Sequence, residues 1–274
     1  MNSYPQAATI AGIDSGGGAG VNADVKTMQE RHVFSATIIV AVTAQNTLGV
    51  QDFEPVSIKL INEQFKSLAD DLNIRACKTG MLADAAHVHA VAQNLQRYDF
   101  GPYTLDPVMV AKGGAHLLSD DAIATVRDEL IPLATVVTPN LPETEALTGG
   151  KIESEADMQA AGHTLQQLGA KNVVVKGGHG SNSQTSSDFV LLENGRSFWL
   201  STPRIATKNT HGTGDTFASC ITAELAKGKN VEAAIRLAKA FIQAAIADGI
   251  DVGHGHGPTN HWAFRKVEQT DAKD

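Results

Sequence analysis

Short apolar runs alternate along the chain with longer segments whose apolar residues recur at helical spacing. The runs are rich in Val, Ile and Thr and are mostly apolar on both faces, as in strands of a parallel sheet covered on both sides. We expect strands at Ala7–Ile13, Ala36–Val42, Ile74–Lys78, Tyr103–Leu105 with Val108–Val110, Ala134–Val137 and Asn172–Val175.

Amphipathic segments lie between these runs. Apolar residues recur every three or four positions, as on one helix face, in the groups Ile61, Phe65, Leu68, Leu72; Val88, Val91, Leu95; and Ile123, Val126, Leu130. Ser119 can cap the third group, and Ser154 with Asp157 resembles a capping box before another helix. The alternation predicts an α/β fold, with a doubly wound, mainly parallel central sheet between two helical layers.

One region departs from this alternation. Asp188–Glu193 and Ser197–Ser201 are strand-like and are joined by Asn194-Gly195, which predicts a type I′ hairpin near residues 188–201. The polar segment Gly180–Ser187 before it is expected to be a flexible surface loop. Helices are expected at about Asp215–Ala226 and Val231–Ala247. We interpret residues 1–274 as one domain, because no internal repeat interrupts the pattern.

The composition limits the classes of molecule that the chain is expected to bind. Lys and Arg number 22 against 30 Asp and Glu, a formal net charge of −8, which disfavours a nucleic acid or an anionic membrane. No apolar stretch reaches the roughly 18 residues of a membrane span, and the N-terminus lacks a signal-peptide pattern. The two cysteines, Cys77 and Cys220, lie in apolar segments and indicate reduced core thiols in a cytoplasmic protein.

The segment Asn209-Thr-His-Gly-Thr-Gly-Asp-Thr216 carries the strongest chemical signal. It leads directly into a predicted helix, and Gly212 and Gly214 allow a tight turn that aims successive amides at one point. Such a helix N-terminus suits a phosphoryl group. Asp215, at its mouth, can accept the proton of an attacking hydroxyl. Alone, the motif also fits a glycine turn with an Asp cap.

Three further segments lie at predicted strand ends. Gly12–Gly20 is glycine-rich but lacks the dinucleotide-binding spacing, and the chain has no P-loop sequence. Asn140 and Glu143 stand three residues apart at a helix start, where they can serve either as a cap or as ligands. Lys176 ends another strand. Because parallel strand ends meet at one edge, we expect these groups to converge on one ligand site.

Together these segments resemble one family. In order and spacing, AGIDSGGGAG, TAQNTLGV, KTGML, LDPVM, TPNLPE, VKGGH and NTHGTGDTF closely resemble the hydroxymethylpyrimidine and phosphomethylpyrimidine kinases of the ribokinase-like superfamily. Related enzymes of the same shape phosphorylate pyridoxine and pyridoxal. The resemblance implies a ribokinase-like fold. It also implies transfer of the γ-phosphate of ATP to hydroxymethylpyrimidine, and then to its monophosphate, in thiamin biosynthesis.

The resemblance also implies roles for individual residues. The general base would be Asp215, beside an anion hole formed by Gly212, Thr213 and Gly214. The phosphates of ATP and Mg²⁺ would be attended by Asn140, Glu143, Lys176 and Thr210, with Glu143 as the Mg²⁺ contact. The pyrimidine would be bound by Gly12, Asp24, Gln45, Met81 and Val108, with Gln45 bonding the polar edge of the ring. Relatives commonly form homodimers, so a homodimer is expected.

One position departs from the family pattern. Many of these pyrimidine kinases have Cys where this chain has Asp215, whereas sugar and adenosine kinases and one pyridoxal kinase branch have Asp. A carboxylate is a competent base, so the departure bears on which alcohol is phosphorylated. Gln45 favours the pyrimidine. A pyridoxal or pyridoxine kinase is the main alternative, ahead of a sugar or nucleoside kinase and of a non-catalytic binding protein.

Weaker signals complete the set of expectations. His254, His256 and His261 fit no zinc spacing and suggest a glycine-rich segment folded back near the cleft. His211 can contact phosphate or simply occupy a turn. Lys112-Gly-Gly114 is a candidate flap over the acceptor, and the adenine pocket is expected near Lys239 and Phe241.

Overall fold

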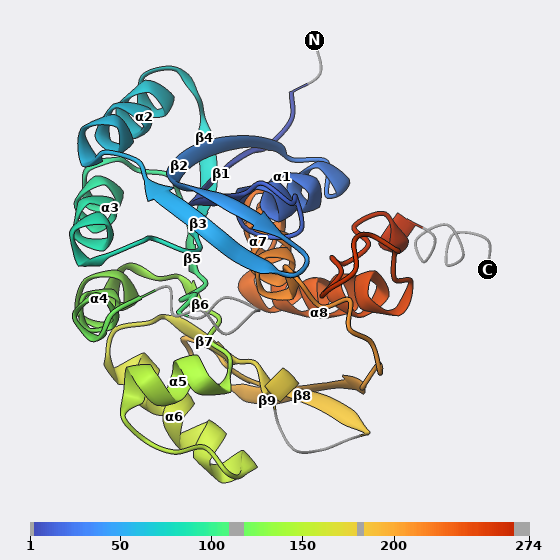
Figure 1. Cartoon of the computed structure of the whole chain (residues 1–274). Coiled ribbons are helices and arrows are strands. Elements are labelled where there is room, and N and C mark those ends of the chain that lie inside the picture. The colour runs from blue at the N-terminus through green and yellow to red at the C-terminus, as the bar shows by residue number, and fades with distance from the viewer. Residues whose placement is uncertain (1–2, 110–117, 180–183, 266–274) are drawn as a thin grey trace.

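A computed structural model describes residues 3–109, 118–179 and 184–265 of the chain. Within these residues, nine strands form one sheet in the order β3-β2-β1-β4-β5-β6-β7-β8-β9 (Figure 1). Neighbouring strands from β2 to β7 are parallel, and β3, β8 and β9 pair antiparallel. The strands are β1 (Gln6–Asp14), β2 (Phe34–Asn46), β3 (Gly49–Pro55), β4 (Ile74–Thr79), β5 (Tyr103–Leu105), β6 (Val136–Val137), β7 (Asn172–Val175), β8 (Thr185–Leu191) and β9 (Ser197–Pro203).

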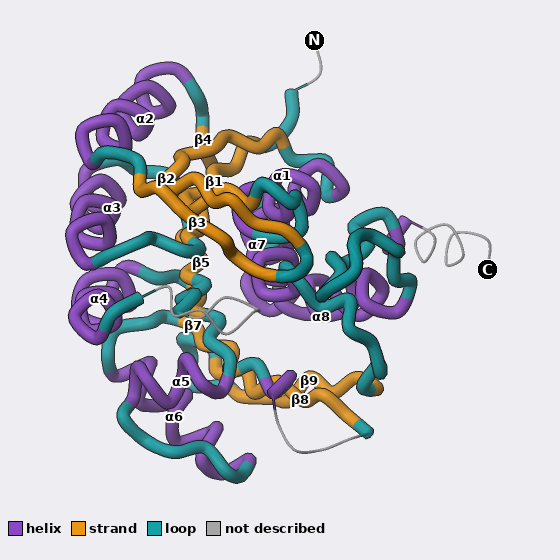
Figure 2. The backbone as a smooth tube through the Cα atoms, viewed as in Figure 1, coloured by secondary structure: helices purple, strands orange, loops and turns teal. Residues whose placement is uncertain are grey.

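Helices cover both faces of this sheet (Figure 2). One face carries α2 (Ile58–Asp71), α3 (Ala85–Arg97), α4 (Asp120–Thr125), α5 (Leu141–Thr148) and α6 (Glu155–Gln167). The other carries α1 (Gly20–Glu30), α7 (Thr213–Ala226) and α8 (Val231–Ala247). The predicted α/β class and the doubly wound, mainly parallel sheet are therefore confirmed.

Strand β7 shows why the apolar runs form central strands. Val173 and Val175 pack into the core under α2–α6, whereas Val174 packs into the core under α7 and α8. All three side chains are fully buried, and each contributes about 1.5–3 kcal/mol relative to an exposed one. Cys77 and Cys220 are also buried, and both are free thiols.

Several element boundaries differ from the sequence prediction. The described residues of Val108–Val110 lie in a loop, because β5 ends at Leu105 and Pro107 has no amide hydrogen to extend the pairing. Strand β6 begins at Val136 rather than Ala134, whose amide closes a 3₁₀ turn. Edge strand β3 was not predicted because its polar residues lack alternation. A π-helical turn, Val126–Leu130, and a 3₁₀ turn, Ile131–Leu133, follow α4.

The hairpin is present, but its turn is not type I′. The amide of Leu192 donates to Arg196 and that of Gly195 donates to Leu192, each at 2.9 Å, so Leu192 and Arg196 close a three-residue loop. Gly195 has a φ of +80°, whereas Asn194 does not adopt positive φ. A type I′ turn needs both central residues there. Residues 185–187, expected in a loop, belong to β8.

The order of strands locates the functional edge of the sheet. Strand β1 lies between β2 and β4, so chain progression reverses direction at β1. Ligands of doubly wound folds bind beyond the carboxyl ends of the strands at such a reversal. Helix α7 packs against β1, β4 and β5, which places its first turn at this edge. None of the described helices is both long and apolar enough to cross a membrane.

Candidate active site

A cavity of about 960 Å³ opens at the carboxyl ends of the parallel strands. Its size suits small molecules. Of the residues to which the resemblance gives a role, every one except Asp24 lines it. Those that line it are Gly12, Gln45, Met81, Val108, Asn140, Glu143, Lys176, Thr210, Gly212, Thr213, Gly214 and Asp215.

The N-terminus of α7 faces this cavity and has no side-chain cap. Gly212 stands at the N-cap with a φ of +76°, and a Cβ there would lie 2.0 Å from the carbonyl oxygen of Gly18. Only glycine fits this turn. Gly214 and Asp215 belong to the first helical turn, where amides have no partner inside the helix. The turn therefore has the geometry that the predicted anion site requires. The helix starts at Thr213, slightly earlier than expected.

A carboxylate and an ammonium lie beside this turn. The Lys176 Nζ is 2.8 Å from Asp106 Oδ1, and Thr138 donates to the same oxygen at 3.3 Å. A Cβ on Gly214 would lie 3.1 Å from Asp106 Oδ2 and 3.5 Å from Lys176 Nζ. Burial opposes the charge of Lys176, but Asp106 and Glu143 outweigh it and raise the pKa of its ammonium. The cavity therefore holds a fixed cation next to the anion site.

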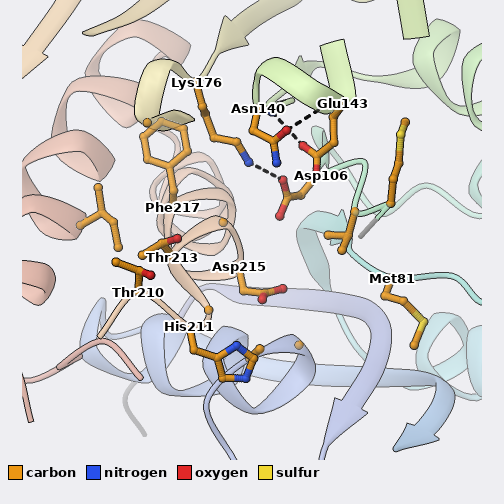
Figure 3. Close-up of a pocket in the computed structure, with 18 of the residues that line it drawn as sticks. Met81, Asp106, Asn140, Glu143, Lys176, Thr210, His211, Thr213, Asp215 and Phe217 are labelled. Carbon is orange, nitrogen blue, oxygen red and sulfur yellow. Dashed lines mark hydrogen bonds and ion pairs between the residues drawn. The ribbon is translucent and has the colours of Figure 1, made fainter. Parts of the chain in front are cut away.

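Asn140 and Glu143 form a helix cap at the wall of the cavity. The Asn140 amide donates to Glu143 Oε2 at 2.8 Å, and the Glu143 amide donates to Asn140 Oδ1 at 3.0 Å, a capping box that starts α5. Both residues also line the cavity. Burial raises the pKa of Glu143 to about 7, with Asp106 acting in the same direction and Lys176 opposing. In Figure 3, Asn140 and Glu143 gather with Asp106 and Lys176 at one end, His211 lies at the other end, and Asp215 lies between them.

Asp24 lies beneath the cavity, and its position corrects the expectation that it lines the pyrimidine site. Its side chain is fully buried between the sheet and α7. Lys78 Nζ and Ser219 Oγ donate to Asp24 Oδ1 at 2.7 and 2.5 Å, and Thr9 Oγ1 donates to Oδ2 at 2.5 Å. Lys78 Nζ also lies 3.3 Å from Asp215 Oδ1. Asp24 therefore reaches the site through Lys78.

The glycine-rich loop after β1 is organised around Asp14. The amides of Gly16, Gly18 and Ala19 donate to its carboxylate at 2.7–2.9 Å. His211 Nε2 lies 3.0 Å from Asp14 Oδ2 and 3.1 Å from the Gln45 amide. Burial acts against the charge, but these hydrogen bonds hold the pKa of Asp14 below its usual value. His211 thus positions the loop and Gln45, and several loop amides are already engaged with Asp14.

The C-terminal glycine-rich segment 253–258 folds back onto the cleft, as predicted. The amides of Gly255 and His256 donate to the Thr47 hydroxyl and carbonyl at 3.1 and 2.8 Å, and the His211 amide donates to the Gly257 carbonyl at 3.1 Å. A Cβ on Gly255 would lie 2.0 Å from the Thr47 carbonyl oxygen. The segment therefore connects the β2–β3 turn, near Gln45, to the loop before α7.

The far end of the cavity is lined by β9, the loop that follows it, and α8. Its apolar residues include Pro203, Ile205, Ile242 and Ile246. Lys239 also lines this end and pairs with Asp188 at 2.7 Å. Phe241 does not. It is almost fully buried against the Phe264 ring, 5.3 Å away between centroids, because it faces the core side of α8.

Sequence reasoning missed Asp106, Lys78 and Asp14 as functional candidates. Asp106 and Asp14 end or follow strands, which is the signal that identified Lys176. Lys78 is a cation inside an apolar run, and a buried cation requires an anionic partner. The candidate flap Lys112–Gly114 lies outside the described residues.

Comparisons with known proteins show which family the chain resembles. The model of a family described as phosphomethylpyrimidine kinase matches residues 14–260. The hydroxymethylpyrimidine/phosphomethylpyrimidine kinase of Haemophilus influenzae is 52% identical over 269 residues, covering 97% of this chain and 100% of that protein.

Solved structures show the same similarity. An ADP complex of Bacillus subtilis pyridoxal kinase superposes with a TM-score of 0.89 and 36% identity, covering 96% of this chain and 99% of that one. The phosphomethylpyrimidine kinase of Clostridium difficile superposes with a TM-score of 0.78 and 36% identity, covering 88% and 99%.

Proposed function

Because the chain belongs to the phosphomethylpyrimidine kinase family, we propose that it transfers the γ-phosphate of ATP to hydroxymethylpyrimidine and to its monophosphate, in thiamin biosynthesis. The chain is a phosphotransferase. The observation that supports this acceptor chemistry most strongly is the position of Asp215. Its carboxylate lies in the first turn of α7, on a cavity that also contains Lys176. A base and a phosphoryl site are therefore adjacent.

In the proposed reaction, Asp215 accepts the proton of the acceptor hydroxyl as its oxygen attacks the γ-phosphorus. A new P–O bond forms, the bond to the β-phosphate oxygen breaks, and ADP leaves with that electron pair. Amides at the start of α7 and the Lys176 ammonium face the transferring group and offset its negative charge. The residues thus supply position and charge, which phosphoryl transfer chiefly requires.

The oxygen donors beside Lys176 suit Mg²⁺. Asp106 and Glu143 together carry more negative charge than Lys176 neutralises when both are ionised, and carboxylate oxygens are preferred Mg²⁺ ligands. Glu143 and Asp106 would hold the ion, which would neutralise nucleotide phosphate charge when bound. Because Asn140 fixes Glu143 through the capping box, this carboxylate is pre-oriented toward the cavity.

The two ends of the cavity suit the two substrates. Gln45, Met81 and Val108 offer an amide and apolar contacts for a flat heteroaromatic ring. The apolar end formed by Pro203, Ile205, Ile242 and Ile246 suits adenine, which leaves the triphosphate to run toward Lys176. A homodimer, implied by the resemblance, and a cytoplasmic location, inferred from the composition, stay predictions.

Pyridoxal phosphorylation is the second candidate. Two observations favour it: the high TM-score with a pyridoxal kinase, and the aspartate at position 215. The same hydroxymethyl chemistry would apply, so the acceptor ring alone separates the candidates.

The proposal is tested by a coupled ADP-release assay with Mg-ATP, with products identified by ³¹P NMR. We expect acceptor-dependent turnover of hydroxymethylpyrimidine to a monophosphate, and of the monophosphate to a diphosphate. Omission of the acceptor is the control. ADP release that is independent of the acceptor, or absent with both pyrimidines, would contradict the proposal.

A further inference from the structure

We infer that Lys78 is a positioning residue for the catalytic base, holding the Asp215 carboxylate in its orientation from beneath the active site. The inference rests on the base role proposed for Asp215. It concerns a residue of the KTGML segment that does not line the cavity and has no assigned role in substrate binding.

The geometry places Lys78 between two carboxylates. Its side chain is fully buried, and Nζ lies 2.7 Å from Asp24 Oδ1 and 3.3 Å from Asp215 Oδ1. Asp24 is equally buried, whereas the side chain of Asp215 keeps 13% of its surface exposed. Lys78 therefore contacts the base on its inner side. The contact through Oδ1 leaves Oδ2 available toward the acceptor hydroxyl.

Asp24 holds Lys78 in this position. Hydroxyls of Thr9 and Ser219 donate to its two oxygens. Burial raises the pKa of Asp24 to about 6 and the ion pair with Lys78 opposes this rise, so Asp24 is ionised at neutral pH. A Cβ on Gly80 would lie 3.4 Å from Lys78 Nζ and 3.5 Å from Asp215 Oδ1, so the backbone that follows β4 closes this contact from the side. Lys78 has no solvent-facing alternative, and the ammonium stays beside Asp215.

The charges around Asp215 explain why a base here needs such a partner. Asp215 is faced by Lys78 from β4 and interacts with Lys176, but the carboxylates of Asp24 and Asp106 share the same surroundings. A bound nucleoside triphosphate adds several negative charges, which repel a nearby carboxylate. Lys78 offsets this effect, and burial makes its charge effective.

The test compares phosphate-transfer rates in single turnovers with labelled Mg-ATP and saturating acceptor. Lys78→Met alone leaves Asp24 buried without a counter-charge, so the decisive variant combines Lys78→Met with Asp24→Asn, whose neutral amide can still bond Thr9 and Ser219. We expect this variant to fold and to lose about 100-fold in rate. The KM for ATP should change little.

The same pair of substitutions is then made in an Asp215→Asn background. If Lys78 acts through Asp215, the substitutions cost less than about threefold there. An equal loss in both backgrounds, or a rate within about threefold of wild type when Asp215 is intact, would overturn the inference.

A matched control removes another buried cation. Arg31 is 6% exposed and pairs with Glu224 at 2.9 Å, away from the cavity lining. Arg31→Met should lower the melting temperature but preserve the transfer rate. All ratios are measured with whichever acceptor the wild type phosphorylates, so failure of the pyrimidine assignment leaves this test intact.

Discussion

Two buried ion pairs flank the start of α7, and they differ in how they meet the cavity. Lys78 is fully buried and contacts Asp24 and Asp215, whereas Lys176 lines the cavity with 16% of its side chain exposed and contacts Asp106. Lys78 and Asp24 can influence substrates only through Asp215. Lys176 can contact a phosphate directly. We therefore propose that one lysine holds the base in position and that the other meets the transferring group.

This difference predicts that substitutions at the two pairs will have different kinetic effects. Loss of the base should affect the chemical step alone, whereas loss of Lys176 should also weaken nucleotide binding. Changes at the acceptor side, farther from both pairs, should change the KM of the acceptor.

The largest effect is expected for Asp215→Asn. Turnover should fall by about 10³–10⁴-fold because no group then accepts the hydroxyl proton. Affinity for ATP, measured by calorimetry, should stay close to that of wild type. An undiminished turnover would exclude Asp215 as the base.

Lys176→Met should have the next largest effect. It removes the cation 2.8 Å from Asp106 and leaves that carboxylate facing the nucleotide phosphates. We expect kcat/KM for Mg-ATP to fall about 100-fold or more. Lys151→Met, at an exposed pair with Glu145, is the control and should be silent. Equal kinetics for the two variants would refute the phosphate-contact role.

Gly255→Ala should act on the acceptor rather than on ATP. Its Cβ would overlap the Thr47 carbonyl, so the β2–β3 turn must move and displace Gln45. The KM of the acceptor should rise about tenfold with a small change in the KM of ATP. Gly150→Ala, where a Cβ would meet only a side-chain oxygen 4.0 Å away, is the control. A parallel rise of both KM values would contradict this coupling.

The smallest expected effect concerns thermal stability. Glu143→Gln should change how the melting temperature depends on pH. The pKa of Glu143 is raised to about 7, above its ordinary 4.5, so the folded protein binds this proton more tightly than the unfolded chain. The resulting stabilisation is fully present below pH 4.5 and is lost as pH rises through about 7.

The glutamine side chain cannot ionise. The melting temperature of the nucleotide-free variant, relative to that of wild type, should therefore rise by a few degrees as pH increases across this window. Parallel pH dependences of the two melting temperatures would show that Glu143 is not the titrating group.

The sequence could predict the fold class and the convergence of the site because both depend on chain order. Parallel strands bring their carboxyl ends to one edge, so Gly12, Asn140 and Lys176 had to lie near one another. Contacts between buried side chains could not be predicted from the order of elements along the chain. Asp24 lies on the buried face of α1, and it pairs with Lys78, which is far from it in the chain.

The turn after β8 shows the same limit at short range. Asn194-Gly195 favours a two-residue type I′ turn locally, but pairing of Leu192 with Arg196 closes a three-residue loop instead. The register of β8 and β9, set by contacts such as Phe189 opposite Trp199, determines the loop length.

The most direct test of the acceptor assignment is a competition experiment. Equimolar hydroxymethylpyrimidine and pyridoxal are incubated with the enzyme and limiting Mg-ATP, and the ratio of initial product rates gives the ratio of their kcat/KM values. Our account predicts that pyrimidine phosphate predominates at least about tenfold. Predominance of pyridoxal phosphate would contradict it and would identify Asp215 as the mark of a vitamin B6 kinase.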